Sequence, residues 1–336
     1  MADSLVIGGG GFIGRRLVNL LLESGRTVRV MSRSADPQLG RPGLVLMRGA
    51  VSQPEAVRAA VDGVKEVFHL ATGGGNQWSD FERDFLDGTR HVIDACRSTA
   101  VRRLIFTSST AALYLGAPGI MRDPAQADPQ PEKRAFYGRA KALAERLVVE
   151  SGLPAVILRP AIVVGKGSAP THSGVGYWAS DLSCIGWGDG RNPLPFVLVD
   201  DVARAMALAI DAPGIDGRSY NLAGDIRPTA REYVDLLAER SFRRYRFHPR
   251  SLALLQSIEI LKWVVKVAAR KPENAFPGFR DLESRSFRTQ IDCSAAKEQL
   301  GWRPNADREV FVREAIDAHI RPVPAGDLRL AAAHLE

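Results

Sequence analysis

The sequence predicts an α/β protein built on a doubly wound parallel sheet, with a smaller C-terminal α/β lobe. Two observations lead to this prediction. A glycine-rich turn joins a short apolar run to a helix-like segment near the N-terminus, and strand-like runs then alternate with helix-like segments as far as residue 160. Such alternation is typical of parallel strands joined by right-handed helical crossovers. The chain of 336 residues, 45% of them hydrophobic, is long enough to bury a large core.

The first apolar run, residues 5–7, ends in glycines. Gly8, Gly11 and Gly14 have the spacing G-x-x-G-x-x-G, and residues 15–23 after them carry leucines at positions 17, 20 and 21. Glycine at these positions allows a sharp turn, close approach of a pyrophosphate to backbone N–H groups and close packing of helix on strand. A flexible turn is the alternative. The strand before it and the amphipathic helix after it favour a dinucleotide site.

The second expected strand, residues 27–31, ends in Ser32 and Arg33. An NAD site of this type has an acidic residue about 20 positions after the glycines, which binds the ribose 2′-hydroxyl. Here Ser32 and Arg33 stand in its place, and a guanidinium suits the 2′-phosphate of NADP. The sequence therefore favours NADP as the cofactor, with NAD as the alternative. A solvated loop arginine is the other interpretation of Arg33.

Further strands are expected at residues 44–47, 67–70 and 103–107, and helices at residues 54–60 and 85–99. The fifth strand ends in hydroxyl residues, Thr107 to Thr110. In a parallel sheet, the carboxyl ends of the strands border the ligand crevice, so these hydroxyls are candidate site groups. His69 is interpreted as a packed strand residue rather than a ligand.

Tyr137 and Lys141 open the next expected helix. Their spacing of four places the phenol and the ammonium on one helix face. A tyrosine pKa near ~10 is too high for a base at neutral pH. Lowering it by about three units takes roughly 4 kcal/mol, the interaction of unit charges at ~4 Å with an effective dielectric of ~20. Lys141 carries such a charge, which makes Tyr137 a candidate general acid or base.

With these motifs in this order, the chain resembles the extended short-chain dehydrogenase/reductases, which include the NAD(P)-dependent epimerase/dehydratases. The resemblance runs from Ser4 to about Pro304 and rests on these segments: 8–14, 69–71, 107–114, Tyr137 with Lys141, 159–160, 195–203, 220–224 and 300–304. It implies a Rossmann domain formed by residues 1–163 with 192–223. It also implies a substrate-binding lobe formed by residues 164–191 with 224–330.

The resemblance implies that Tyr137 and Lys141 act with one hydroxyl, which is Thr110 in the sugar-nucleotide pattern and Ser109 in the alcohol-dehydrogenase-like pattern. The family often has an acidic residue after the third strand, but this chain has Ala50 there, so the adenine contact must come from backbone. The implied cofactor-binding residues are Gly8, Gly11, Phe12, Ile13, Gly14, Ser32, Arg33, Ala50, Val51, Leu70, Ala71, Thr72, Tyr137, Lys141, Pro160, Ile162 and Val163.

The resemblance also bears on substrate and assembly. Sugar-nucleotide enzymes of the family commonly have an asparagine after the Arg-Pro step and an arginine before the later VDD segment. This chain has residues 161–165 (AIVVG) and 192–195 (NPLP) there. We therefore expect hydride transfer between nicotinamide and a secondary alcohol or ketone of a small molecule. The alternatives are a nucleotide-sugar epimerase or dehydratase with tightly bound NAD(P), and a catalytically silent NAD(P)-binding scaffold. The helices at 85–99 and 137–150 pair across a two-fold axis in relatives, which predicts a homodimer.

Composition narrows the location and partners. Three widely spaced cysteines suggest neither a disulfide framework nor a metal site. The N-terminus shows no signal-peptide pattern, and apolar runs are too short for a membrane span. A cytoplasmic protein is expected. The net charge of +7 is modest for this length, so no nucleic-acid partner is predicted.

Two C-terminal segments stand out. Residues 240–250 contain five arginines alternating with aromatic residues, which predicts an edge strand with a solvated basic face. An anion clamp or an attachment to acidic lipid is the alternative. Residues 251–269 form a helix with a wide apolar face, which we expect to be buried. It would roof a hydrophobic pocket, pack at a subunit interface or lie on a membrane surface.

Overall fold

The computed structural model describes residues 2–33, 42–75, 77–99, 101–270 and 276–319. At its centre is a seven-stranded sheet in the order β3-β2-β1-β4-β5-β7-β12, in which all neighbouring strands are parallel. The strands are β1 (Ser4–Ile7), β2 (Val28–Ser32), β3 (Leu44–Arg48), β4 (Glu66–His69), β5 (Arg103–Thr107), β7 (Ala155–Pro160) and β12 (Ser219–Leu222). The strand order reverses between β1 and β4, which is where such sheets bind ligands. The predicted fold class is confirmed.

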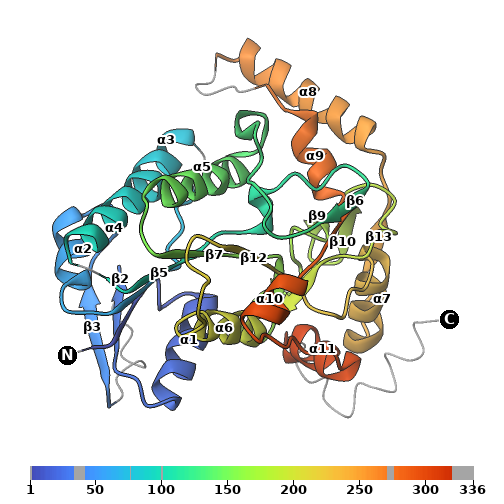
Figure 1. The fold of residues 1–336 in the computed structure, drawn as a ribbon. Coiled ribbons are helices and arrows are strands. Elements are labelled where there is room, and N and C mark those ends of the chain that lie inside the picture. Colours follow the sequence, from blue (N-terminus) through green and yellow to red (C-terminus); the bar gives the residue numbers. More distant parts are fainter. Residues whose placement is uncertain (1, 34–41, 76, 100, 271–275, 320–336) are drawn as a thin grey trace.

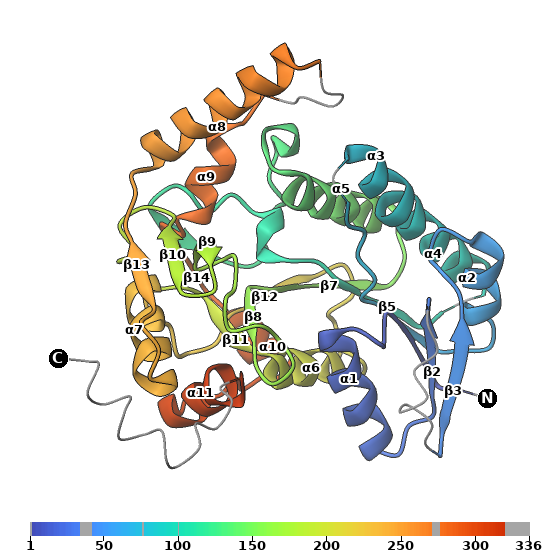
Figure 2. The same ribbon diagram turned by 180° about the vertical axis from the view of Figure 1, so that it is seen from behind.

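Helices cover both faces of this sheet (Figures 1 and 2). One face carries α1 (Phe12–Glu23) and α6 (Val199–Leu208), which share a hydrophobic core with the strands. The other face carries α2 (Pro54–Val61), α4 (Asp87–Ser98) and α5 (Phe136–Glu150) around a second core. The helix predicted at 85–99 corresponds to α4, which starts at Asp87 because residues 85 and 86 belong to a π-helical turn (Glu82–Leu86) that follows the short helix α3 (Trp78–Phe81).

The central strands are buried on both faces. Every residue of β1, β4, β5 and β7 is buried, as expected for parallel strands with helices on each side. On α5, buried Ala140, Ala144 and Val148 recur every four residues and face the sheet. Small side chains at two of these positions let α5 approach the sheet closely. This approach brings Tyr137 and Lys141 to the carboxyl ends of the strands.

Smaller sheets and further helices lie beside the carboxyl ends of the strands (Figure 2). A three-stranded sheet has the order β13-β10-β9, and two further pairs are β11 with β8 and β14 with β6. The elements are β6 (Gly119–Met121), β8 (Ile162–Val164), β9 (Gly176–Ser180), β10 (Ser183–Gly186), β11 (Phe196–Leu198), β13 (Arg246–His248), β14 (Thr289–Ile291), α7 (Ala230–Ser241), α8 (Leu252–Ala268), α9 (Phe279–Arg285), α10 (Ser294–Gln299) and α11 (Arg308–Ala315). The division into two lobes at the expected positions stays a prediction, and residues 320–330 lie outside the described residues.

The structure corrects the expected edge strand at 240–250. Arg240 lies in the last turn of α7, and Phe242 follows in the left-handed conformation with φ 52°. Only residues 246–248 form a strand, at the edge of the three-stranded sheet. The reason is that α7 continues past residue 238 to Ser241, where Leu237 and Ser241 are buried and the Ser241 hydroxyl donates a hydrogen bond to the Leu237 carbonyl.

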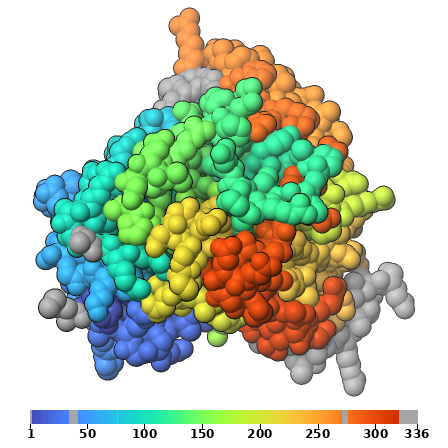
Figure 3. Space-filling view, in the orientation of Figure 1, coloured from blue at the N-terminus to red at the C-terminus, as the bar shows by residue number. Residues whose placement is uncertain are grey.

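The expected burial of the apolar face at 251–269 is also wrong within this chain. The helix α8 forms over residues 252–268, but no residue of it is buried, and Leu261 is 65% exposed. Its partly polar side meets the body of the protein, where the Gln256 side chain donates a hydrogen bond to the Pro277 carbonyl at 2.6 Å. The helix lies at the rim of the molecule (Figures 1 and 3), and its apolar side chains are exposed there. None of the described helices is both long and apolar enough to cross a bilayer.

Candidate active site

The glycine turn after β1 leaves no room for side chains. Gly8 has φ +87°, and a Cβ on it would lie 2.9 Å from the Ala71 backbone nitrogen. A Cβ on Gly14 would collide with the Gly8 carbonyl oxygen. Gly11 is the N-cap residue of α1, so no side chain covers the first N–H groups of that helix. This turn fits the pyrophosphate of a dinucleotide, because uncovered N–H groups at a helix N-terminus bind anions.

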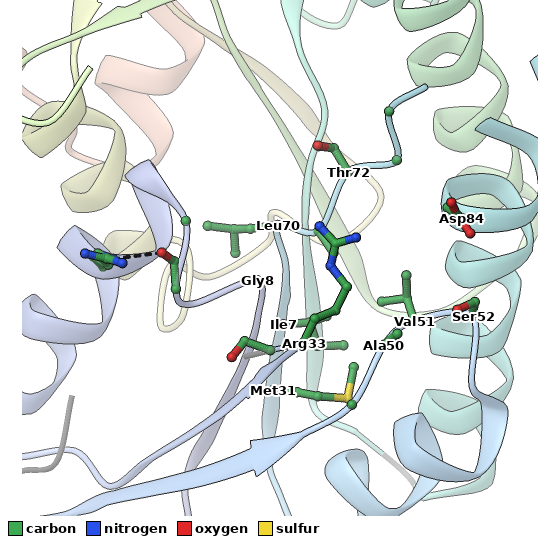
Figure 4. Close-up of a pocket in the computed structure, with 18 residues that line it drawn as sticks. Ile7, Gly8, Met31, Arg33, Ala50, Val51, Ser52, Leu70, Thr72 and Asp84 are labelled. Atoms are coloured by element: carbon green, nitrogen blue, oxygen red, sulfur yellow. Dashed lines mark hydrogen bonds between the residues drawn. The ribbon is translucent and has the colours of Figure 1, made fainter. Parts of the chain in front are cut away.

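A cleft of about 780 Å³ opens beside this turn, between the ends of β1, β2 and β4 (Figure 4). Arg33 extends into it from the end of β2, and Ala50 and Val51 form part of its wall. Nine of the residues expected to bind the cofactor line the cleft: Gly8, Gly11, Ser32, Arg33, Ala50, Val51, Leu70, Ala71 and Thr72. Its walls thus come from the loops after β1 to β4, as a dinucleotide site requires.

The charge in this cleft is mainly basic. Arg15 also lines it, and its Nε donates a hydrogen bond to the Gly10 carbonyl at 2.7 Å. Asp84 lies at the other side of the cleft and pairs with Arg83 at 2.9 Å. The hydrogen bond from Arg83 is the main reason that the pKa of Asp84 lies below its ordinary value, and the charge of Arg33 contributes. Sequence reasoning missed Arg15, although it directly follows the glycine motif, and Asp84, because only folding brings its π-helical turn against this cleft.

A smaller cavity of about 270 Å³ continues from the glycine turn to the catalytic candidates. It is lined by Ser109, Tyr137 and Lys141 together with further residues expected to bind the cofactor, including Phe12, Ile13, Pro160 and Val163, whereas Ile162 lines only the adjoining cavity. A third cavity of about 530 Å³ adjoins it and shares Phe12, Ser109, Tyr137, Ala161 and Val163. The structure therefore brings the glycine turn, a hydroxyl, a phenol and an amine together at one place.

Lys141 is almost fully buried, with 1% of its surface exposed. Its Nζ donates a hydrogen bond to the Thr107 carbonyl at 2.9 Å and lies 4.5 Å from the centre of the Phe85 ring. Burial lowers the pKa of Lys141 to about 7, and the nearby Glu145 partly opposes this. The amine is consequently divided between its charged and neutral forms near neutral pH.

Tyr137 lies 5.9 Å from the Lys141 Nζ, measured to the ring centre. The residue is 44% exposed and lines both cavities, and its side chain shares a hydrogen bond with Ser109. Burial raises the pKa of Tyr137, and the hydrogen bond with Ser109 opposes this. This direction differs from the expected effect of Lys141, because the amine is directed at the Thr107 carbonyl and is itself only partly charged.

The two candidate hydroxyls occupy different positions. Ser109 lines both the smaller cavity and the adjoining one, and its Oγ accepts a hydrogen bond from the Ala111 N–H at 3.1 Å. Thr110 is buried at the start of a short 3-10 helix and lines only the adjoining cavity. Ser109 therefore lies closer to the place where the glycine turn and Tyr137 meet.

Buried groups behind the site fix the helix that carries it. Glu145, one turn after Lys141, accepts two hydrogen bonds from Arg159 of β7, at 2.9 and 2.7 Å. This pair joins α5 to the sheet. His69 is buried on β4, with its Nε2 3.2 Å from the Thr89 hydroxyl oxygen. Burial and the charge of Lys141 lower the pKa of His69 to about 3, so it is neutral and packed, as the sequence predicted.

Apolar atoms make up most of the exposed wall of the adjoining cavity, with contributions from Leu115, Ile162 and Phe287, but polar side chains are about as numerous among its lining residues. Ala135, Ala161 and Val163 add to this wall. Its polar residues include Arg134 and Arg285, which both pair with Asp281. Sequence reasoning missed Asp281, Arg285 and the residues of the loop at 168–174, because α9 and this loop reach the cavity only in the folded chain.

The described cysteines, at positions 96, 184 and 293, are buried and unpaired. Within the described ranges, no three His, Cys, Asp or Glu side chains gather into a possible metal site. The site must therefore be interpreted from its hydroxyl, phenol, amine and glycine turn.

Comparison with known families gives a match over residues 4–223, to a sequence model described as "NAD dependent epimerase/dehydratase family". A 2-alkyl-3-oxoalkanoate reductase of Stenotrophomonas maltophilia is 32% identical over 243 residues, which cover 69% of this chain and 74% of that protein. Sterol demethylase protein B of Methylococcus capsulatus is 28% identical over 332 residues, covering 92% of this chain and 95% of that one.

Among solved structures, MoeE5 in complex with UDP-glucose and NAD is similar, with a TM-score of 0.71 and 25% identity. The superposition covers 94% of this chain and 98% of MoeE5.

Proposed function

The chain belongs to the NAD dependent epimerase/dehydratase family, as the resemblance of its motifs predicted, and we propose that it is a reductase or dehydrogenase of apolar small molecules. Its reaction would be hydride transfer between a nicotinamide cofactor and a secondary alcohol or ketone. The main support is that Ser109 and Tyr137 line both the smaller cavity beside the glycine turn and the adjoining cavity, whose exposed wall is mainly apolar. The names of the reductase and of the sterol demethylase protein point to substrates of the same kind.

In the direction of reduction, the bound nicotinamide supplies the hydride to the carbonyl carbon. The Tyr137 hydroxyl donates its proton to the carbonyl oxygen, while the Ser109 hydroxyl donates a hydrogen bond to the same oxygen. The products are the alcohol and the oxidised cofactor. Placed proton transfer is typically worth about 10² to 10⁴ in rate. Lys141 would bond the nicotinamide ribose, and Thr110 is the second candidate hydroxyl.

For the cofactor we propose NADP(H) within this NAD-dependent family. Arg33 lies in the cleft at the end of β2, where an acidic residue would favour NAD, and Arg15 adds a second guanidinium. The nearest acid in the cleft wall, Asp84, is engaged by Arg83. A phosphate on the ribose would therefore meet the Arg33 guanidinium, which extends into the cleft.

A nucleotide-sugar epimerase or dehydratase is the second candidate. The likeness to MoeE5, which binds UDP-glucose and NAD, favours it. The mainly apolar exposed surface of the proposed substrate cavity favours the reductase, whereas its polar lining residues, including Arg134 and Arg285, would suit a sugar, whose hydroxyls need polar partners. A catalytically silent binding protein is the third candidate.

The test is a cofactor-linked assay with 2-alkyl-3-oxoalkanoates, oxosteroids and UDP-glucose. Net conversion of NADPH to NADP⁺ supports the reductase, whereas turnover without net cofactor change supports the epimerase or dehydratase. We expect Tyr137→Phe to lose at least about a hundredfold in kcat while still binding cofactor. Lys141→Ala should lose both turnover and cofactor binding.

Tyr177→Phe is the matched control, because it removes the same oxygen from an exposed tyrosine, 58% accessible on β9. Near-full turnover in Tyr137→Phe would show that the proton comes from another group. Cofactor binding without turnover of any substrate class would favour the silent protein.

A further inference from the structure

One helix of this protein presents its apolar side to the outside. Leu254, Ile258, Leu261 and Val265 of α8 follow one another at intervals of four, three and four residues, so they form one face. They are 47%, 41%, 65% and 60% exposed, and the adjacent Val264 is 48% exposed. We call these five residues the outer face of α8. An exposed apolar patch of this kind marks an interaction site.

The helix is held with its other side toward the protein. Gln256 donates its hydrogen bond to the Pro277 carbonyl, and Trp263 packs edge-on against Phe276 with ring centres 5.3 Å apart. Neither residue belongs to the outer face. The orientation of α8 on the body is therefore set by specific contacts that leave the apolar side free, on the rim of the molecule (Figures 1 and 2).

The charge around this helix is one-sided. Residues 241–270 contain seven Arg and Lys residues against one acidic residue, Glu259. Lys262 and Lys266 lie on α8 beside the outer face, and Arg243, Arg246 and Arg250 are exposed just before it. An apolar helix face flanked by cations is complementary to a partner that has an apolar layer beneath a surface of anionic groups.

We propose that the outer face of α8 docks on the surface of a lipid bilayer that contains anionic lipid. The apolar side chains enter the boundary of the acyl region, and the neighbouring lysines and arginines meet the headgroups. The helix lies in the plane of the surface, since it is not apolar or long enough to cross.

A second copy of this chain is the other possible occupant, and the charge argues against it. In a two-fold interface the same patch is used on both subunits. Lys262 and Lys266 beside the face of one copy would then lie near the same lysines of the other, and the one acidic residue of the helix, Glu259, already pairs with Lys262. The excess of positive charge near α8 therefore favours binding to an anionic bilayer surface over binding to a second copy.

Docking through α8 has a consequence for the pocket. The helix α8 packs on α9, whose Asp281, Ser284 and Arg285 line the proposed substrate cavity. Only α9 therefore lies between the docking helix α8 and the proposed substrate cavity. This point depends on the proposed function, whereas the docking itself does not.

The experiment is flotation of the whole protein with vesicles. The unaltered protein should bind vesicles of phosphatidylcholine mixed with phosphatidylglycerol about tenfold more tightly than vesicles of phosphatidylcholine alone, and added salt should reduce the difference. Val264→Asp should weaken binding to the mixed vesicles about tenfold. Val45→Asp is the matched control, because Val45 on β3 is also a valine with 48% exposure but lies far from α8 (Figure 1).

A second measurement does not depend on a charged substitution. The described cysteines are buried, so Val264→Cys can be labelled selectively with an environment-sensitive dye, whose emission should shift to the blue on mixed vesicles. Absence of vesicle binding by the unaltered protein would overturn the proposal, as would equal binding by Val264→Asp and Val45→Asp. A doubled mass in solution that Val264→Asp abolishes would assign the face to a second copy instead. Each of these readouts is independent of enzymatic turnover.

Discussion

Lys141 offers a test of the site that needs no substrate. Its amine is 1% exposed, and burial lowers its pKa from 10.5 to about 7. The unfolded chain therefore binds more protons than the folded chain between these two values. Stability rises with pH where the unfolded state binds more protons, so this residue destabilises the fold most below pH 7, and the effect vanishes above pH 10.5.

The magnitude follows from the two pKa values. Linkage gives a cost of about 5 kcal/mol at pH ~6 and about 1 kcal/mol at pH ~10. Lys141→Met removes the titrating group and keeps a side chain of similar length. The variant also loses the hydrogen bond to the Thr107 carbonyl, a constant cost of about 1 kcal/mol. We expect the variant to be the more stable protein at pH ~6, and its advantage to shrink by about 4 kcal/mol by pH ~10.

The assay is urea unfolding of both proteins, without cofactor, at several pH values across this range. The useful quantity is the difference in unfolding free energy between the two proteins, since titrations that they share cancel. A difference that stays constant with pH would show that Lys141 keeps its charge when buried, and the reasoning would be refuted. A difference that grows with pH would mean that Glu145 or another group raises the pKa of the amine rather than lowering it.

Two further predictions concern the cofactor and the assembly. Arg33→Ala should erase most of a preference for NADP(H) over NAD(H), and Arg58→Ala, which removes an exposed arginine of α2, should leave the preference intact. Calorimetry with the unaltered protein would contradict this if NAD bound equally well or better. Pairing of α4 and α5 across a two-fold axis predicts a homodimer at micromolar concentration, and a monomer mass by light scattering would contradict it.

The cofactor end of the protein could be predicted from local sequence. The glycine spacing, the apolar strands and the Tyr137-Lys141 spacing are short-range patterns, because each depends on the geometry of one turn or one helix. The strand ends and the cleft residues follow from them, since alternating strands and helices have few possible arrangements. The structure agrees with these expectations to within a few residues at the ends of the elements.

The substrate cavity could not be predicted in the same way. Arg134, Phe287 and the loop at 168–174 are far apart in the chain and meet only through the packing of α9 and the smaller sheets. The position of Ser109 relative to Thr110 also depends on the short 3-10 helix that follows β5. Sequence position alone did not distinguish which of the two hydroxyls is the better catalytic candidate.

The helix at 252–268 shows most clearly the difference between what the sequence pattern determines and what the tertiary structure decides. Its period of apolar residues by itself determined that a helix with a wide apolar face forms there. Periodicity describes one helix and says nothing of which side the rest of the protein covers. Only the tertiary contacts of Gln256 and Trp263 decided that the apolar face points outward, because the orientation of a helix is set by what packs against it.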